Sequence, residues 1–301
     1  MTVTISRIAF IGTGLMGAPM VARLVGAGFA VRVWNRSPEK LRPLVALGAA
    51  SAASPAEAVA DSELVCLCLT DGEAIGELLF GLAGLAEAMA AGALLIDFST
   101  IGPKATRALA SRLASSRPDI GWIDAPVSGG VRGAETGELV IMCGGEEGAV
   151  AAVGPVLSVL AKRVCHLGPL GNGQAAKLCN QLIVSASIVA ISEALILGRE
   201  QGLDIAALPA ALEGGWADSL PLQIIGGRMA VGCDDPPIVS IDTFVKDLAL
   251  VLDSAGRTPE LAAKTADIYA VAAAGGGGAS DVTTLIERIG GANSTVARDE
   301  G

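Results

Sequence analysis

The sequence predicts an α/β protein: an N-terminal Rossmann-type doubly wound sheet followed by an all-α C-terminal domain. In the first part, short apolar runs rich in β-branched residues alternate with longer Ala/Leu/Glu segments, a pattern typical of a mainly parallel sheet. After Gly168 the strand-like runs stop and helical patterns follow. We therefore expect a Rossmann domain over residues 1–168, an all-helical domain over 169–290 and a flexible tail over 291–301, where no apolar period remains.

Six short apolar runs are the expected strands of the first domain. The segments between most of them, such as 19–29 and 54–62, are helical in period or composition. Repetition of strand and helix joins parallel strands through helical crossovers, which places helices on the faces of the sheet. The expected strands are residues 8–12, 31–35, 64–69, 94–99, 122–126 and 139–144.

The second domain is expected to be built around one long helix from Gln174 to Gln201. This segment is apolar on most of its faces, so we expect it to be buried in a domain core or against a second subunit. Further helical patterns follow over 208–215, 243–256 and 259–275. The long apolar helix predicts a homodimer or homotetramer in which the helical domains pack together.

Composition and charge exclude several classes of protein. Apolar residues make up 51% and charged residues 17%, which excludes a wholly disordered chain. A net charge of −10 without a local basic run argues against a nucleic-acid partner. The apolar stretches are interrupted within about 18 residues and no signal peptide is recognisable, so we expect a cytoplasmic protein without a membrane partner. No zinc-binding spacing, and therefore no metal site, is expected among Cys66, Cys68, Cys143, Cys165, Cys179 and Cys233.

A glycine-rich turn directly after the first expected strand points to a dinucleotide. The segment GTGLMG places Gly12, Gly14 and Gly17 in the spacing GxGxxG, between a strand and a helix. The first glycine permits the tight turn, the second lets the backbone approach a diphosphate, and the third lets helix and strand pack closely. The diphosphate would then lie over the N-terminus of the helix. A purely structural glycine turn is the alternative.

The end of the second expected strand indicates which dinucleotide is bound. It reads Asn35-Arg36-Ser37, where sites for NAD usually carry Asp or Glu to bind the ribose 2′-hydroxyl. Asn35 has no charge to repel a 2′-phosphate, and Arg36 can pair with one through two hydrogen bonds. We therefore favour NADP(H) over NAD(H), the alternative being that Arg36 is a solvated loop residue.

The residue types that are scarce in this chain exclude most dehydrogenase chemistries. The single histidine, His166, has no acidic residue within two positions and is expected to be structural. The single tyrosine, Tyr269, lacks the lysine four residues later that a Tyr–Lys pair requires. A zinc alcohol dehydrogenase is excluded by the cysteine spacing. A lysine or a carboxylate remains as the group that donates and accepts the proton.

Lys177 is the best candidate for that group. It lies near the start of the long helix, where both the helix N-terminus and an apolar setting disfavour the charged ammonium. Both effects bring a lysine nearer to the working pH of a general acid/base. Gly171 and Gly173 are expected to leave room for substrate or nicotinamide. An ordinary surface lysine in the first turn of a helix is the alternative.

Five segments, in this order, carry a resemblance to a known family. They are FIGTGLMGAPM (10–20), IDFSTIGP (96–103), DAPVSGGVRGAETGEL (124–139), GNGQAAKLCNQ (171–181) and KDL (246–248). Together they resemble the motifs of the β-hydroxyacid dehydrogenase family, which includes 3-hydroxyisobutyrate dehydrogenases and 2-hydroxy-3-oxopropionate reductases within the 6-phosphogluconate dehydrogenase superfamily. The similarity covers essentially the whole chain apart from the tail.

The resemblance implies a role for each residue that matches a family motif. Lys177 would be the acid/base, Asn180 would orient the substrate, and Asp247 would help to fix the region of the cleft. The residues expected to bind the substrate, a small carboxylate, are Ser128, Gly129, Gly130 and Gln181. The residues expected at the cofactor are Gly12, Gly14, Leu15, Met16, Gly17, Asn35, Arg36, Ser37, Thr70, Thr100 and Lys246.

The resemblance implies an oxidoreductase that interconverts a short 3-hydroxy acid and its semialdehyde or keto form. Three alternatives remain open. Residues 241–255 look closest to relatives acting on sugar acids such as L-threonate. Imine reductases share the architecture but usually replace the lysine with Asp or Tyr. A non-catalytic dinucleotide-binding protein need not retain Lys177, Ser128 and Gly129. Gln181 departs from the family pattern, since some relatives have asparagine at this position.

Overall fold

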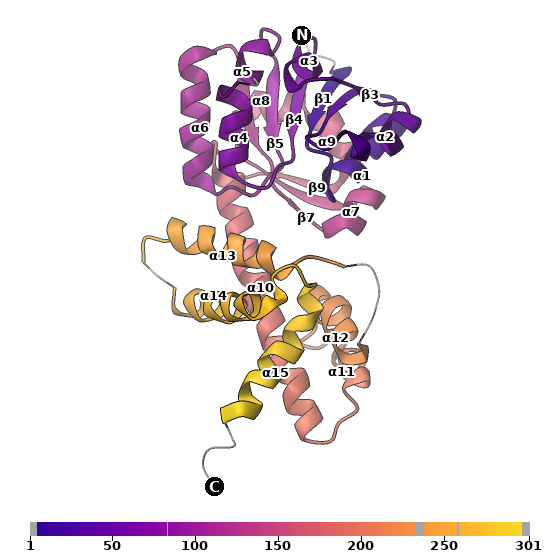
Figure 1. The fold of residues 1–301 in the computed structure, drawn as a ribbon, viewed down its shortest axis with the longest axis vertical. Coiled ribbons are helices and arrows are strands. Elements are labelled where there is room, and N and C mark those ends of the chain that lie inside the picture. The colour runs from indigo at the N-terminus through magenta and orange to yellow at the C-terminus, as the bar shows by residue number, and fades with distance from the viewer. Residues whose placement is uncertain (1–4, 83, 233–236, 258, 297–301) are drawn as a thin grey trace. The chain divides into compact units, whose positions relative to one another are not determined.

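The protein consists of two compact units in the computed structural model, which describes residues 5–82, 84–232, 237–257 and 259–296. The chain divides into these units between Lys177 and Leu178, nine residues beyond the boundary expected from the sequence. The long helix α10 (Asn172–Glu200) contains this boundary, so the change from strand-like to helical sequence precedes the division into units. Figure 1 shows the order of the elements.

Unit 1 is built on a six-stranded sheet in the order β3-β2-β1-β4-β5-β6. All five pairings in this sheet are parallel, which confirms the doubly wound sheet. The order of the strands reverses between β1 and β4, and ligands of such sheets bind outside the carboxyl ends of the strands at this point. The strands are β1 (Arg7–Ile11), β2 (Ala30–Trp34), β3 (Ala50–Ser51), β4 (Leu64–Leu67), β5 (Leu94–Asp97) and β6 (Gly121–Asp124).

A second sheet of three strands corrects the expectation for residues 139–144. That segment forms β8 (Leu139–Cys143), which pairs with β7 (Val127–Ser128) and β9 (Ala161–His166). Its link to the main sheet is the antiparallel bridge between Gly144 and Asp124, the last residue of β6. β7 runs antiparallel to β8, and β9 runs parallel to it. The reversal after β6 therefore ends the parallel sheet and begins a separate, smaller one.

Apolar side chains pack on both faces of the main sheet. Along β1, Ile8 and Phe10 belong to one buried cluster, and Ala9 and Ile11 belong to the other, as the alternation of a strand requires. Helices α1 (Gly17–Gly26) and α9 (Gly154–Leu160) contribute to the first cluster, and α4 (Gly72–Phe80) and α6 (Pro103–Ser116) to the second (Figure 1). The remaining helices of this unit are η1 (Pro38–Leu41), α2 (Arg42–Ala46), α3 (Pro55–Val59), α5 (Leu85–Ala88), α7 (Gly130–Thr136) and α8 (Glu147–Ala152).

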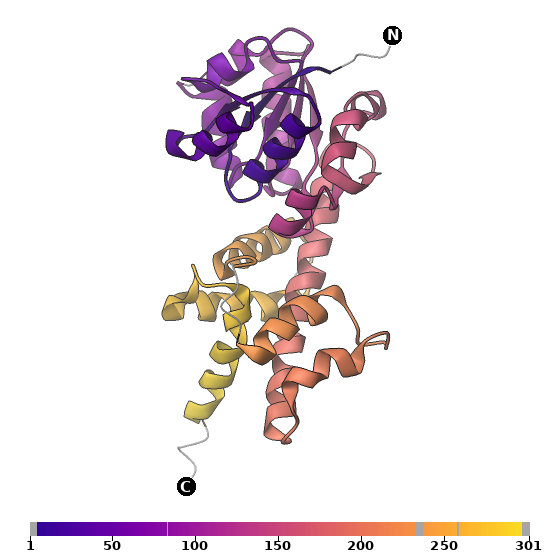
Figure 2. The same cartoon turned by 90° about the vertical axis from the view of Figure 1, so that its right-hand side faces the viewer.

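Unit 2 contains only helices among its described residues, which confirms the predicted all-α domain. Its core packs Ile188 and Leu195 of α10 with Phe244 and Tyr269, whose rings lie 5.1 Å apart. Figure 2 shows the helices of this unit turned by 90° from Figure 1. The other helices are η2 (Ile205–Ala207), α11 (Leu208–Leu212), η3 (Leu222–Gly226), α12 (Gly227–Val231), α13 (Ile241–Ser254), α14 (Glu260–Ala272), η4 (Ala273–Gly277), η5 (Val282–Thr284) and α15 (Leu285–Val296).

Two details of the helices differ from the expectations. By length and composition α10 is apolar enough to cross a membrane, although part of its apolar surface, including Ile188, Ile191 and Leu195, packs in the core of unit 2. Helix α15 continues to Val296, so the first six residues of the expected tail over 291–301 are helical. Residues 297–301 and Cys233 lie outside the described residues.

Candidate active site

The glycine turn after β1 has the geometry that a diphosphate cradle requires. Gly12 has φ 94°, a value that L side chains rarely adopt, and its N–H donates to the Trp34 carbonyl at 3.0 Å. A Cβ at Gly17 would overlap the carbonyl oxygen of Gly12, whereas a Cβ at Gly14 would meet nothing within 4 Å. Gly12 and Gly17 therefore serve the turn, and Gly14 leaves open space beside the backbone. Leu15 is 83% exposed in the same turn.

The end of β2 is tied to this turn through a side chain. Asn35 accepts a hydrogen bond from the Thr13 N–H at 3.2 Å with Oδ1, and its Nδ2 donates to the Ser37 carbonyl at 3.1 Å. Both bonds occupy the Asn35 amide with protein groups, so it holds the turn in place. The neighbouring Arg36 side chain is exposed.

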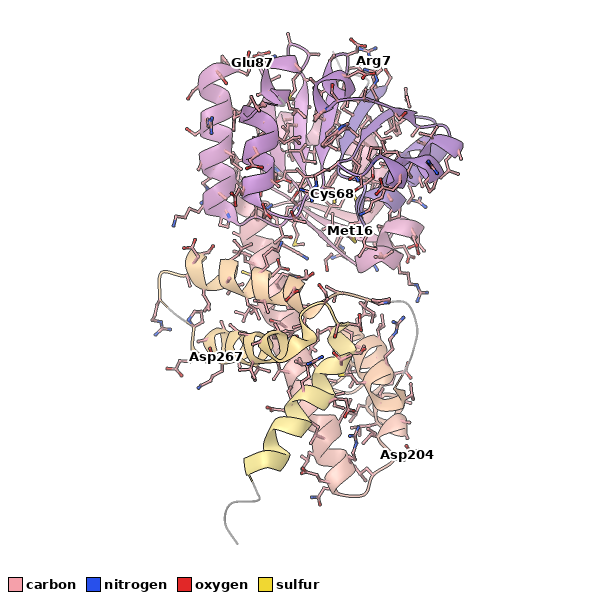
Figure 3. All side chains as sticks on the ribbon, viewed as in Figure 1. Arg7, Met16, Cys68, Glu87, Asp204 and Asp267 are labelled. Carbon is pink, nitrogen blue, oxygen red and sulfur yellow. The ribbon has the colours of Figure 1, made fainter. Side chains whose placement is uncertain are left out.

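Loops at the carboxyl ends of β4 and β5 lie at the same edge of the sheet. The Leu69 N–H donates to Ser99 Oγ at 2.8 Å, which joins the loop that carries Thr70 to the loop that carries Thr100. Figure 3 labels Met16 and Cys68 at this edge and Arg7 at the opposite one. The glycine turn and the loops with Thr70 and Thr100 are thus gathered in unit 1.

The segment expected to hold a carboxylate forms the junction of β7 and α7. Ser128 ends β7, and it is followed by Gly129 with φ 126° and Gly130 with φ 61°. Side chains at these two positions would be strained, and a Cβ at Gly129 would also press on Leu139. Both glycines are exposed, so their backbone N–H groups are accessible for donation to an anion.

The first turn of α10 is anchored by a buried carboxylate. Asp124, at the end of β6, accepts from the Gly171 N–H and from the Gln174 N–H, both at 2.7 Å. Burial raises the pKa of the Asp124 carboxyl, while these two backbone donors act to lower it. A Cβ at Gly173 would overlap the Met142 carbonyl oxygen. Gly173 therefore allows close packing of protein against protein, which contradicts the expectation that it makes room for a ligand. The atoms nearest to a Cβ at Gly171 belong to the Arg107 side chain.

Lys177 is buried on α10, with only 8% of its surface exposed. Its Nζ donates to the Val127 carbonyl at 2.8 Å, directly before Ser128 in the chain. The alternative of an ordinary surface lysine does not fit this burial. The acid/base candidate and the expected carboxylate site therefore share one peptide unit of unit 1.

Within unit 2, a chain of side-chain hydrogen bonds begins one turn after Lys177 along α10. Asn180 Nδ2 donates to Gln181 Oε1 at 2.9 Å, and Gln181 Nε2 donates to Asp247 Oδ2 at 2.6 Å. The Lys246 ammonium lies 3.2 Å from the other oxygen of Asp247, whose side chain is 3% exposed. A glutamine in place of asparagine at position 181 is thus long enough to reach the carboxylate of α13.

Two buried groups of the site escaped the sequence analysis. Gln174 and Asp124 bind backbone groups far away in the chain, and no local pattern signals such bonds. Their places in the sequence could have indicated these two residues, because Asp124 ends an expected strand and Gln174 begins the expected helix that carries Lys177. His166 has the structural role expected, since its Nε2 lies 2.9 Å from the Gly145 carbonyl and 3.0 Å from the Gly168 carbonyl. Among the residues that the structure describes, no three His, Cys, Asp or Glu side chains form a metal-binding group.

Comparison with known proteins gives matches over both units. Residues 7–168 match a family model described as the NAD binding domain of 6-phosphogluconate dehydrogenase. Residues 171–289 match one described as the NAD-binding domain of NADP-dependent 3-hydroxyisobutyrate dehydrogenase. The two models together cover nearly the whole chain.

Relatives of similar length match almost end to end. The 2-hydroxy-3-oxopropionate reductase of Escherichia coli is 34% identical over 286 residues, which are 94% of this chain and 97% of that protein. The 3-sulfolactaldehyde reductase of Escherichia coli is 31% identical and covers 94% of this chain and 96% of its own length. Among solved structures, a Mycobacterium tuberculosis 3-hydroxyisobutyrate dehydrogenase with L-serine has a TM-score of 0.85 at 33% identity, covering 95% of this chain and 99% of that chain.

Proposed function

The chain belongs to the β-hydroxyacid dehydrogenase family and is an NAD(P)-dependent oxidoreductase of hydroxyacids, and from that premise we propose that Lys177 is its general acid/base. The substrate pair is a short 3-hydroxy acid and its semialdehyde or keto form. The observation that carries the proposal is the burial of Lys177, with Nζ held at 2.8 Å from the Val127 carbonyl. A bound nicotinamide accepts or supplies the hydride.

The geometry around Lys177 suits a proton transfer in either direction. A neutral amine keeps two N–H groups, so it can donate to Val127 and still receive a hydroxyl proton on its lone pair. The hydrogen bond fixes the direction of Nζ, and burial removes competing water. In the reducing direction the ammonium returns the proton to the oxygen of the carbonyl substrate.

The substrate carboxylate is assigned to the junction of β7 and α7. Ser128 supplies a hydroxyl donor, and the exposed backbone of Gly129 and Gly130 supplies N–H donors. Because Val127 precedes Ser128, binding of the carboxylate here orients the hydroxyl-bearing carbon toward the peptide unit to which Lys177 is bound. Asn180 and Gln181 are assigned to the orientation of the substrate.

The glycine turn fits a dinucleotide, since it combines a positive φ at Gly12, open space at Gly14 and the start of α1. We assign NADP(H) in preference to NAD(H). The Asn35 amide is engaged with protein groups and carries no charge, while the exposed Arg36 is available for a 2′-phosphate.

The choice of cofactor is tested by Arg36→Ala. A hydrogen bond to a charged group contributes about 1.5–3 kcal/mol, so the KM for NADP⁺ should rise on the order of tenfold or more. The KM for NAD⁺ should stay unchanged. Arg163→Ala, which removes an exposed arginine on β9, is the matched control. Equal effects of Arg36→Ala on both cofactors would overturn the preference.

The reaction is tested with a panel of acids, by following the absorbance of the reduced nicotinamide. The panel contains 3-hydroxyisobutyrate, D-glycerate, L-threonate, L-serine and 3-hydroxypropionate. Lys177→Ala should lower kcat by about 10²–10⁴-fold, the range of a lost general acid/base, while Lys162→Ala, at an exposed lysine of β9, should match the parent. Turnover that survives in Lys177→Ala would refute the assignment.

The panel also separates the alternatives. Preference for L-threonate would indicate a sugar-acid dehydrogenase. Tight NADPH binding with no turnover of any acid, but reduction of a cyclic imine, would indicate an imine reductase. Binding without either activity would indicate a non-catalytic protein. The presence of Lys177 favours the hydroxy acid.

We propose a homodimer or homotetramer in the cytoplasm, with neither nucleic acid nor membrane as a partner. Apolar side chains exposed on α10 support an association of helical units, among them Ile183 at 66% and Leu197 at 57% exposure. Sedimentation as a monomer at micromolar concentration would contradict the assembly.

A further inference from the structure

The side chain of Gln174 is fully buried one turn before Lys177 on α10. Its Nε2 donates to the Ser99 carbonyl at 2.7 Å. Its Oε1 accepts from the N–H groups of Ile101 and Gly102, at 3.1 and 3.0 Å. All three bonds lead to a single loop, the one that follows β5.

These bonds enclose Thr100 from both sides. One amide group binds the carbonyl of the residue before Thr100 and the N–H of the residue after it. Both peptide planes that flank Thr100 are therefore fixed relative to α10. The same loop is fixed to the segment before Thr70, because Ser99 Oγ accepts from the Leu69 N–H.

Anchoring of the helix does not by itself account for this arrangement. The start of α10 is already held by Asp124, which accepts from the backbone of Gly171 and Gln174. An apolar side chain of equal length would fill the same volume but would leave the Ser99 carbonyl and the N–H groups of Ile101 and Gly102 without this partner. What the amide adds is a fixed orientation of the loop with Thr100.

We propose that Gln174 is a positioning residue for the reaction, which holds Thr100 in register with Lys177. A helical rise of about 1.5 Å per residue places Gln174 only about one turn from Lys177, so the two groups move together. The loop with Thr100 is expected at the cofactor, and the register therefore sets the position of the cofactor relative to Lys177, the proposed proton acceptor. This inference rests on the proposed function.

Two substitutions separate positioning from packing. Gln174→Met keeps the length and removes all three hydrogen bonds. Gln174→Glu keeps the shape and the acceptors for Ile101 and Gly102 but places a buried charge in the core. If Gln174 serves packing alone, Gln174→Met should perturb the protein less than Gln174→Glu does. If Gln174 positions the loop, Gln174→Met should disturb residues 99–102 more than Gln174→Glu does. Ser192→Ala is the control, because it removes a buried side-chain hydrogen bond from the same helix.

The first measurement is amide hydrogen exchange over residues 99–102, followed by mass spectrometry without substrate. Exchange should increase in Gln174→Met, increase less in Gln174→Glu and stay at the parental rate in Ser192→Ala. The second measurement is kinetic. We expect kcat to fall about 10–100-fold in Gln174→Met, as for a displacement of about 1 Å, with little change in the KM for the acid.

The outcomes distinguish the two proposals. Parental exchange over 99–102 in Gln174→Met overturns the positioning role whatever the reaction is. A parental kcat in Gln174→Met, measured at a temperature well below its unfolding temperature, overturns it as well. If the parent oxidises no acid of the panel, the proposed function fails. Hydrogen exchange and the dissociation constant of NADPH then still decide whether Gln174 fixes the loop. Should Gln174→Met fail to fold, Gln174→Glu is compared with Ser192→Ala instead. The positioning role is then contradicted if Gln174→Glu keeps the parental exchange, the parental kcat and the parental affinity for NADPH.

Discussion

A methyl group added at Gly173 should lower both the stability and the activity of the protein. A Cβ at this position would overlap the Met142 carbonyl oxygen, and it would lie 2.8 Å from the Asp124 carbonyl oxygen and 2.9 Å from Asp124 Oδ2. Two of these atoms belong to the backbone and cannot rotate away. The start of α10 must therefore move outward, and it carries Lys177 with it.

The size of the effect follows from two opposing terms. Alanine is favoured over glycine within a helix by up to about 1 kcal/mol. Overpacking of a well-packed site costs about 1–3 kcal/mol, and the upper end applies where backbone atoms form the wall. We expect Gly173→Ala to lower the free energy of unfolding by about 1–2 kcal/mol. A shift of the helix of about 1 Å would in addition lower kcat by about 10²-fold.

Gly26→Ala is the matched comparison. Gly26 is an exposed residue of α1, and a Cβ there would meet nothing within 4 Å. The same chemical change should raise the free energy of unfolding by about 0.5–1 kcal/mol and leave kcat unchanged. Urea unfolding and steady-state kinetics of the two variants check this. If Gly173→Ala is as stable and as active as Gly26→Ala, the close packing of α10 against β8 and the end of β6 is not what holds Lys177.

Three further predictions concern other parts of the molecule. Asp247→Ala should lower the free energy of unfolding by about 1–3 kcal/mol in urea titrations, because it leaves the buried amide of Gln181 without its acceptor, whereas Asp247→Asn should cost less. Cys179 should react with a thiol reagent near neutral pH, while Cys68 should not, because burial raises the pKa of its thiol to about 12; equal labelling rates would contradict this. The backbone N–H groups of Ser6 and Arg7 lower the pKa of Glu63, so its contribution to stability is present above the ordinary glutamate pKa and is lost as pH falls through the lowered value. Parent and Glu63→Gln should therefore differ in stability at neutral pH and converge in acid, as measured by unfolding across pH.

The parallel sheet could be predicted because its strands are continuous apolar runs. β1 and β4 are buried on both faces, so that their sequences show no polar alternation and stand out from the helices. The strands β3 and β7 have two residues each, too few for any periodicity to be visible. The pairing of β8 with β7 and β9 could not be predicted either, because the residues of a strand do not indicate which strands pair with it.

The candidate site could be predicted only where local chemistry defines it. The spacing of Gly12, Gly14 and Gly17 imposes a turn by itself, and its geometry is the expected one. The roles of Asp124 and Gln174 depend on bonds that span 50 and 73 residues, and such bonds leave no trace in neighbouring residues. The same reason explains the wrong expectation for Gly173, whose neighbour Met142 comes from another strand.

The buried position of Lys177 links the proposed acid/base to the proposed carboxylate site. Its Nζ is bound to the carbonyl of Val127, and the same peptide unit continues into the N–H of Ser128. The Ser128 hydroxyl, which is assigned to the carboxylate of the acid, therefore belongs to the residue that directly follows the partner of Lys177. Any shift of the carboxylate site is transmitted to Lys177 as a change in the length or angle of one hydrogen bond. An acid that is longer or shorter by one carbon should therefore show a larger fold decrease in kcat than fold increase in KM, because its hydroxyl would lie out of hydrogen-bond reach of Lys177.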